Sequence, residues 1–144
     1  MNIGIESGYN QATWQNKACV AATTAFNARS VSDTFTVTVT APPGQLLTRV
    51  LYQQSGSRFL ERSLYWRASG TGQLSANGVN VPFSFTTPNL TQTIDLTGQN
   101  VASATISVSI SMSAGRSTNQ PRVTDPPGSA SISVTSAMIS VESA

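Results

Sequence analysis

The sequence predicts an all-β protein, an antiparallel β-sandwich of jelly-roll type with about eight to ten strands. Three observations predict this fold. In several segments, hydrophobic and polar residues alternate with a period of two, which is the pattern of a strand with one buried face. Turn sequences rich in Gly, Pro and Asn separate these segments at intervals of roughly 8–12 residues. No segment carries a convincing helical pattern.

The N-terminal segment is the least patterned part of the sequence. We expect residues 1–33 to form an irregular arm on a single domain that spans residues 1–144. Within the arm, residues 16–27 read "NKACVAATTAFN", where the Ala content favours a helix while the Thr residues and Val20 favour a strand.

Two residues of this arm are candidates for contacts between molecules. Trp14 either fills a core or anchors the arm in a neighbouring subunit. Cys19 is the only cysteine, so it cannot form a disulfide within the chain. It is either a buried small hydrophobic residue, which is the usual environment of a free cysteine, or an intermolecular contact.

The first strong strand signals follow the arm. In "TFTVTVT" at 34–40, Phe35, Val37 and Val39 share one face and the Thr residues share the other. The next segment, "LLTRVLY" at 46–52, is apolar on both faces and predicts a central strand.

The later segments repeat the alternation. "GVNVPFSF" at 78–85 has Pro82 on its polar face, and because proline cannot donate to a strand ladder we expect an edge strand. Residues 91–96 predict a short strand with Ile94 and Leu96 inward, and 102–112 predict a longer one with the same alternation. In 129–143 the apolar set shifts by one residue after Val134, which predicts a β-bulge at Ser136. Turns are predicted at 41–45, 54–57, 69–72, 76–78 and 97–100.

The stretch "RFLERSLYWR" at 58–67 is basic and aromatic, and it allows two interpretations. In the first it is one half-buried strand. In the second it is a binding surface, where Arg62 and Arg67 contact carboxylate, sulfate or phosphate and Tyr65 and Trp66 provide flat faces for sugar rings or bases. The strand interpretation is the simpler one.

The segment 113–129 is too long for a hairpin turn, and it contains Arg116 and Arg122. It is either a solvated, proline-rich loop or a binding loop on a rigid sandwich. Arg116 and Arg122 therefore join the candidate ligand-binding residues.

Composition excludes most catalytic chemistry. The chain has no His, which removes the usual general base, zinc ligand and catalytic triad. Its Asp and Glu residues are scattered, with neither calcium-loop spacing nor a Gly-rich phosphate loop nearby. We therefore predict a protein that is not an enzyme, with no catalytic residues, metal or cofactor.

Only 10% of the residues are charged, against about 25% in an average protein, and Ser, Thr, Asn and Gln fill the polar positions. This is typical of secreted or particle-forming β proteins, and the net charge of +2 makes nucleic acid an unlikely partner. No apolar run reaches the ~18 residues of a membrane helix. The sequence does not open with a signal peptide, and we expect an extracellular or cell-surface chain in its mature form.

The strand ending in Ala-Pro-Pro-Gly at 41–44, the Ser/Thr-rich alternation at 102–112 and the closing strand at 129–143 resemble secreted bacterial β-sandwich proteins found in sorted or matrix-associated exoproteins. The resemblance spans residues 33–142. It assigns no functional residue, and the apolar sorting tail of such proteins is absent from this sequence.

These observations lead to three hypotheses. The first is a non-catalytic structural or surface-matrix protein that self-associates into an oligomer or polymer, with the N-terminal arm supplying a strand to a neighbour. The second is a carbohydrate-binding module that recognises a polysaccharide. The third is a viral coat or decoration subunit, or a nucleic-acid-binding β protein.

Overall fold

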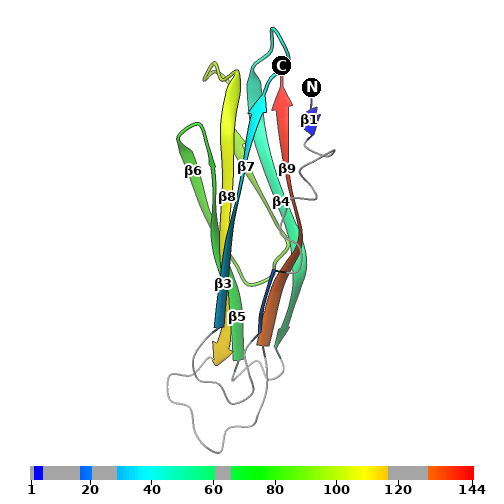
Figure 1. Ribbon diagram of the computed structural model, residues 1–144, viewed down its shortest axis with the longest axis vertical. Helices are drawn as coiled ribbons and strands as arrows, with labels where there is room; N and C mark the ends of the chain where they lie inside the picture. Colours follow the sequence, from blue (N-terminus) through cyan, green and yellow to red (C-terminus); the bar gives the residue numbers. More distant parts are fainter. Residues whose placement is uncertain (1, 5–16, 21–28, 61–65, 117–129) are drawn as a thin grey trace, which may run out of the picture.

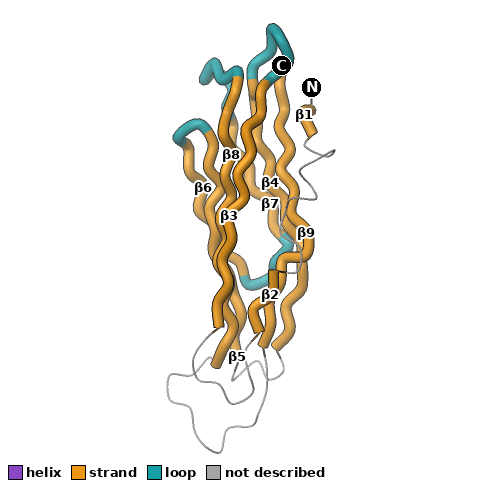
Figure 2. The backbone as a smooth tube through the Cα atoms, viewed as in Figure 1, coloured by secondary structure: helices purple, strands orange, loops and turns teal. Residues whose placement is uncertain are grey.

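The structure is a computed structural model that describes residues 2–4, 17–20, 29–60, 66–116 and 130–144. Its strands form two antiparallel sheets that face each other and run along the long axis of the molecule (Figure 1, Figure 2). The described residues contain no helix. The predicted all-β sandwich is therefore confirmed.

Nine strands are described, which agrees with the predicted range. Their bounds are β1 Asn2–Gly4, β2 Lys17–Val20, β3 Arg29–Thr40, β4 Leu47–Leu60, β5 Trp66–Ala76, β6 Val79–Phe85, β7 Leu90–Asp95, β8 Ser103–Arg116 and β9 Ala130–Ser143.

The strand pairing is that of a jelly roll. One sheet has the order β1-β9-β4-β7, with β2 also on β9, and the other has the order β3-β8-β5-β6. The pairs are nested along the chain: β5 pairs with β6, β4 with β7, β3 with β8, and β1 and β2 with β9. A long antiparallel ribbon folded over in this way places successive pairs of strands alternately in the two sheets.

The core lies between the sheets and follows the predicted alternation. Val37 and Val39 of β3 are buried, and so are Ile106, Val108 and Ile110 of β8. Each fully buried aliphatic side chain of this kind stabilises the fold by about 1.5–3 kcal/mol relative to an exposed one. The Thr and Ser residues between them point away from the core, because successive side chains of a strand point to opposite faces.

Strand β4 is interior, as predicted, since it pairs with both β7 and β9. The register of β4 with β9 explains why its sequence has apolar residues on both faces. The register skips Thr48, so that Leu47 and Val50 are both buried although they are three residues apart. A bulge therefore returns the apolar residues to the core, while Leu46 stays 38% exposed.

The predicted bulge in β9 is confirmed, and the residue that the register skips is Thr135. Ser136 pairs with Ser55, whereas Val134 pairs with Gly56. The shift keeps Val134 and Ala137 both in the core.

Two predicted turns, at 54–57 and 69–72, are wrong because their glycines lie within strands. A Cβ on Gly56 would collide with the backbone carbonyl of Ser133, and a Cβ on Gly70 would collide with the ring of Phe85. Glycine is required there by a close approach of neighbouring atoms, and it does not reverse the chain.

The other three predicted turns are confirmed. Asn77 and Gly78 both have positive φ, at 49° and 77°, and they connect β5 to β6. At 41–45, the amide of Gln45 donates to the carbonyl of Pro42 at 3.0 Å. At 97–100, the amide of Gln99 donates to the carbonyl of Leu96 at 3.1 Å.

Strand β6 is an edge, as Pro82 predicted, and Pro82 is exposed. The apolar face of β6 closes the sandwich. The Phe83 ring stacks on the Tyr52 ring of β4, with ring centroids 5.9 Å apart, and on the Phe85 ring at 6.2 Å. The contact between Phe83 and Tyr52 connects the two sheets.

The described parts of the N-terminal segment are strands. β1 lies beside the C-terminal end of β9, with Ile3 opposite Val141, and β2 lies along the beginning of β9 (Figure 1). The first residues of β3, from Arg29, also fall within 1–33.

Candidate functional site

A groove of about 600 Å³ follows the bulge of β9 on the five-stranded sheet. We call it the bulge groove. It is lined by Gln53, Gln54, Ser55, Asn89, Leu90, Thr91, Ser136, Ala137 and Met138. These residues come from β4, β7 and β9 and from the connection that precedes β7.

The backbone register places the lining residues in rows across three strands. Gln53 of β4 lies between Thr91 of β7 and Met138 of β9. The neighbouring row places Gln54 between Leu90 and Ala137. Bulges alter the direction in which side chains point and recur beside binding sites, which agrees with a groove at this position.

One side chain of the groove closes the irregular part of the ladder. The Oδ1 atom of Asn89 accepts a hydrogen bond of 3.0 Å from the amide of Gly56, the residue that faces the bulge. The amide group of Asn89 then has its two N–H donors left for a ligand. Gln53 is exposed, so its side chain can present both a donor and an acceptor.

Hydrogen bonds inside the sandwich fix the buried part of the groove lining. Gln54 is only 5% exposed, and its Oε1 accepts a hydrogen bond of 2.6 Å from the hydroxyl of Tyr52. Its Nε2 donates to the carbonyl of Pro88 at 2.8 Å. Burial raises the pKa of Tyr52, so the phenol stays protonated and remains the donor. The orientation of the Gln54 amide is thereby fixed.

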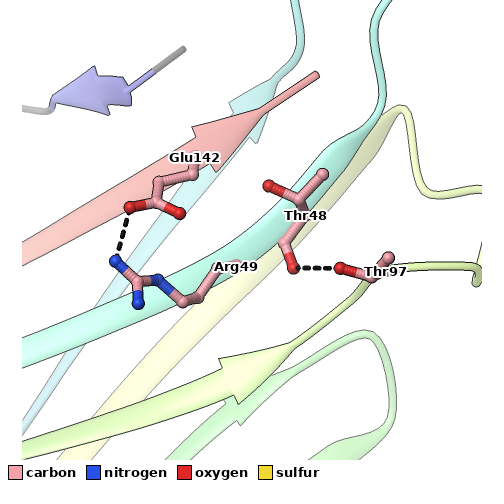
Figure 3. Close-up of polar contacts among 4 residues, drawn as sticks. All are labelled: Thr48, Arg49, Thr97 and Glu142. Atoms are coloured by element: carbon pink, nitrogen blue, oxygen red, sulfur yellow. Dashed lines mark hydrogen bonds and ion pairs between the residues drawn. The ribbon is translucent and has the colours of Figure 1, made fainter.

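None of the described residues that line the groove is charged, and the charged residues described on this sheet lie elsewhere. Arg49 of β4 forms an ion pair of 2.5 Å with Glu142 of β9 (Figure 3). The other register partner of Arg49 is Asp95 of β7. The amide of Thr97 donates to Asp95 at 2.9 Å and lowers the pKa of that carboxyl. Both members of the ion pair are well exposed, so it contributes at most about 1 kcal/mol to stability.

The interpretation of 58–67 as a single strand is wrong. Arg58 belongs to β4 in one sheet, whereas Arg67 belongs to β5 in the other. The Nη1 atom of Arg58 reaches the carbonyl of Ala68 at 3.4 Å, and Phe59 is 57% exposed. The chain leaves one sheet and enters the next within this stretch.

The structure brings three of the predicted ligand-binding residues to one end of the four-stranded sheet. Trp66 of β5 is the register partner of Arg116, which ends β8, and Arg67 next to it is exposed. Arg116 therefore belongs to a strand, which corrects the predicted loop that begins at residue 113.

The structure gives less information about the remaining predicted residues. Cys19 lies in β2 as the register partner of Ile132, which is fully buried. Trp14, Arg62, Tyr65 and Arg122 lie outside the described residues, so their roles stay predictions.

Sequence reasoning missed the polar residues of the bulge groove. Gln53 and Asn89 belong to no motif, and amides of this kind are common on sheet surfaces. The one available signal was the bulge predicted at Ser136, because bulges recur at binding sites.

Two kinds of feature are absent from the described part of the chain. No three His, Cys, Asp or Glu side chains among these residues are close enough to hold a metal ion. None of the described residues forms a helix that is long and apolar enough to cross a membrane.

Comparison with known proteins does not identify a family for this chain. No protein-family model matches the chain, and no curated protein matches it. Among solved structures, it is similar to a carbohydrate-binding module determined in complex with β-1,4-galactotriose. The identity is 14%, the match covers 94% of this chain and 92% of the other, and the TM-score is 0.41. At this level the likeness carries no conclusion about the ligand.

Proposed function

We propose that this protein is a non-catalytic extracellular module that binds a neutral polysaccharide in the bulge groove. The observation that carries the proposal is the lining of the groove, which combines amides and hydroxyls with apolar atoms and has no charged side chain among the described residues. Jelly rolls occur in lectins and in viral coats, so the groove supports this choice and the fold alone does not.

The groove lining matches the chemistry of a sugar ring. A pyranose has hydroxyl groups around its rim and C–H groups on its faces. The Gln53 amide offers a donor and an acceptor to adjacent hydroxyls, and the Asn89 N–H groups add further donors. Met138, which is half-buried and lies in the same row as Gln53, offers an apolar surface to a C–H face, and its flexible side chain adapts to the shape of the ring.

Because the described lining residues are uncharged, the groove should favour neutral glycans over charged ones. A uronic acid or a sulfated sugar would lose water from its anionic group without gaining a cationic partner in the groove, and this desolvation is costly. Neutral chains avoid that cost. The expected ligands are therefore neutral polysaccharides.

Replacing Gln53 tests the proposal. We expect Gln53→Ala to weaken binding by about three- to tenfold, because each lost neutral hydrogen bond contributes ~0.5–1.5 kcal/mol. The measurement is retardation in affinity electrophoresis through soluble neutral glucan, galactan, mannan and xylan, with polygalacturonate as the charged comparison.

The matched control is Gln73→Ala, which removes a half-buried Gln from the outer face of the other sheet. It should bind as the unchanged protein does. Equal retardation of Gln53→Ala and the unchanged protein, or no retardation by any neutral polysaccharide, would contradict the proposal.

Self-association is the second candidate function, and one observation favours it. β1 and β2 attach to the rest of the sandwich by backbone pairing along β9. The same pairing can form between two chains if the N-terminal segment of one lies on the β9 of another.

A further inference from the structure

The outer face of the four-stranded sheet has an unusually uniform chemistry. Every outward residue of β3 from Ser30 to Thr40, and every outward residue of β8 from Ser103 to Ser113, is Ser or Thr. All of them are exposed or half-buried. We call these two adjacent rows the hydroxyl face.

This uniformity is more than solubility requires. A solvated protein surface normally has about 25–35% charged residues of both signs, and the hydroxyl face has none. Of the outward positions described on the adjoining strand β5, only Arg67, at its far end, is charged.

Hydrogen bonds across the two strands hold the hydroxyls in place. The Oγ atoms of Thr36 and Ser107 are 3.1 Å apart, and the same distance separates the Oγ1 atoms of Thr38 and Thr105. The Oγ atoms of Thr40 and Ser103 repeat it, again at 3.1 Å. Each pair uses one donor and one acceptor, which leaves one O–H and several lone pairs for the solvent side.

The backbone sets the repeat of this array. Neighbouring strands are about 4.8 Å apart, and alternate residues of one strand are about 6.7 Å apart. The Thr side chains of β3 are β-branched and therefore stiff at χ1, so their methyl groups recur at the same spacing as their hydroxyls. Water molecules that bind to these hydroxyls are therefore expected to follow the same two-dimensional repeat.

The chemistry of the face argues against most partners. A protein partner would be expected to meet aromatic, Met or Arg side chains, and none lies in these two rows. A polyanion needs clustered cations. A sugar ring needs an apolar surface for its C–H face, and these rows lack a large apolar side chain such as Met138 of the bulge groove. An uncharged partner with hydrogen-bonding groups at fixed spacing remains.

We propose that the hydroxyl face binds the surface of ice crystals. Ordered waters on the Thr and Ser hydroxyls join the crystal, and the Thr methyl groups occupy positions between them. This inference is independent of glycan binding in the bulge groove, which lies on the other sheet.

The test is the uptake of the full chain into slowly growing polycrystalline ice, together with inhibition of ice recrystallisation. The variant Thr38→Lys places a hydrated charge in the middle of the face, and Thr38 is exposed, so folding should be preserved. Thr93→Lys is the matched control, because Thr93 is an exposed strand residue of the other sheet.

We expect the unchanged protein and Thr93→Lys to be enriched in ice, and Thr38→Lys to require about tenfold more protein for the same inhibition. Exclusion of the unchanged protein from ice would overturn the proposal. So would equal activity in Thr38→Lys, or equal loss in Thr93→Lys. Retention on microcrystalline cellulose that Thr38→Lys abolishes, without ice uptake, would assign the face to an insoluble polysaccharide and overturn it as well.

Discussion

At the scale of single residues, the hydrogen-bonded chain from Tyr52 through Gln54 to the Pro88 carbonyl places polar atoms inside the sandwich without leaving them unpaired. The Tyr52 hydroxyl is the donor that satisfies the Gln54 oxygen. This oxygen has no access to solvent that could replace a lost partner, since Gln54 is buried.

We therefore expect Tyr52→Phe to lower the free energy of unfolding by about 1–3 kcal/mol, the cost of leaving a buried acceptor unsatisfied. Denaturant unfolding measures the change. Thr93→Val, which removes an exposed hydroxyl, is the control and should change stability by less than about 0.5 kcal/mol. An effect of Tyr52→Phe as small as this control would contradict the role given to the hydroxyl.

Tyr52 also makes the stability of the protein depend on pH. Burial raises the pKa of Tyr52 above its ordinary value of 10.0, so in alkaline solution the unfolded chain loses this proton first. The contribution is fully present below pH 10 and is lost as the pH rises above it. The unchanged protein should thus lose stability above pH 10 more steeply than Tyr52→Phe, and parallel curves would contradict this.

At the scale of elements, the glycines within strands β4 and β5 allow neighbouring groups of the same sheet to approach the backbone closely. Gly56 faces the backbone carbonyl of Ser133, which belongs to the ladder beside the β9 bulge. Gly70 faces the ring of Phe85 on the edge strand β6. A backbone carbonyl in a ladder cannot move without breaking hydrogen bonds, whereas a ring at the sheet edge can shift.

Gly56→Ala should therefore destabilise the protein by about 1–3 kcal/mol or more, and Gly70→Ala should destabilise it less. Ser69→Ala, at an exposed position of β5, is the control for a change that does not introduce a clash. Thermal and denaturant unfolding of the three variants measure the order of their stabilities. If Gly70→Ala proves the more damaging of the two, the bulge is less tightly packed than the structure indicates.

At the scale of the whole molecule, the N-terminal segment determines whether β9 is an edge strand of the five-stranded sheet. β9 pairs with β4 on one side and with β1 and β2 on the other. Without the N-terminal strands, the backbone groups along this side of β9 would lose their partners, and an unpaired edge is a template for pairing with another chain.

Deleting residues 1–28 should therefore make the protein associate more readily with increasing concentration. Light scattering with and without reductant measures the mass, and negative-stain imaging shows the form of any assembly. Dissociation of an assembled full-length protein on truncation would instead mean that the segment supplies its strands to a neighbour. A truncated chain that stays monomeric at all concentrations would contradict an exposed β9 edge.

The sequence by itself determined the fold class, the alternating faces of the long strands, the edge position of β6 and the bulge in β9. These features depend on local alternation and on single residues such as Pro82, whose effect on backbone hydrogen bonding is the same in any fold. The row of Thr residues on β3 likewise follows from the alternation of "TFTVTVT" alone.

Only the tertiary structure decided which strands lie side by side. It alone showed that Gly56 and Gly70 serve close approach, that the stretch at 58–67 is divided between two sheets, and that Gln53 lies between Thr91 and Met138. Cross-strand pairs join residues far apart in the chain, and the period-two pattern of one strand does not specify its partner or its register. The bulge groove and the hydroxyl face both depend on such pairs, and for this reason neither could be assembled from the sequence alone.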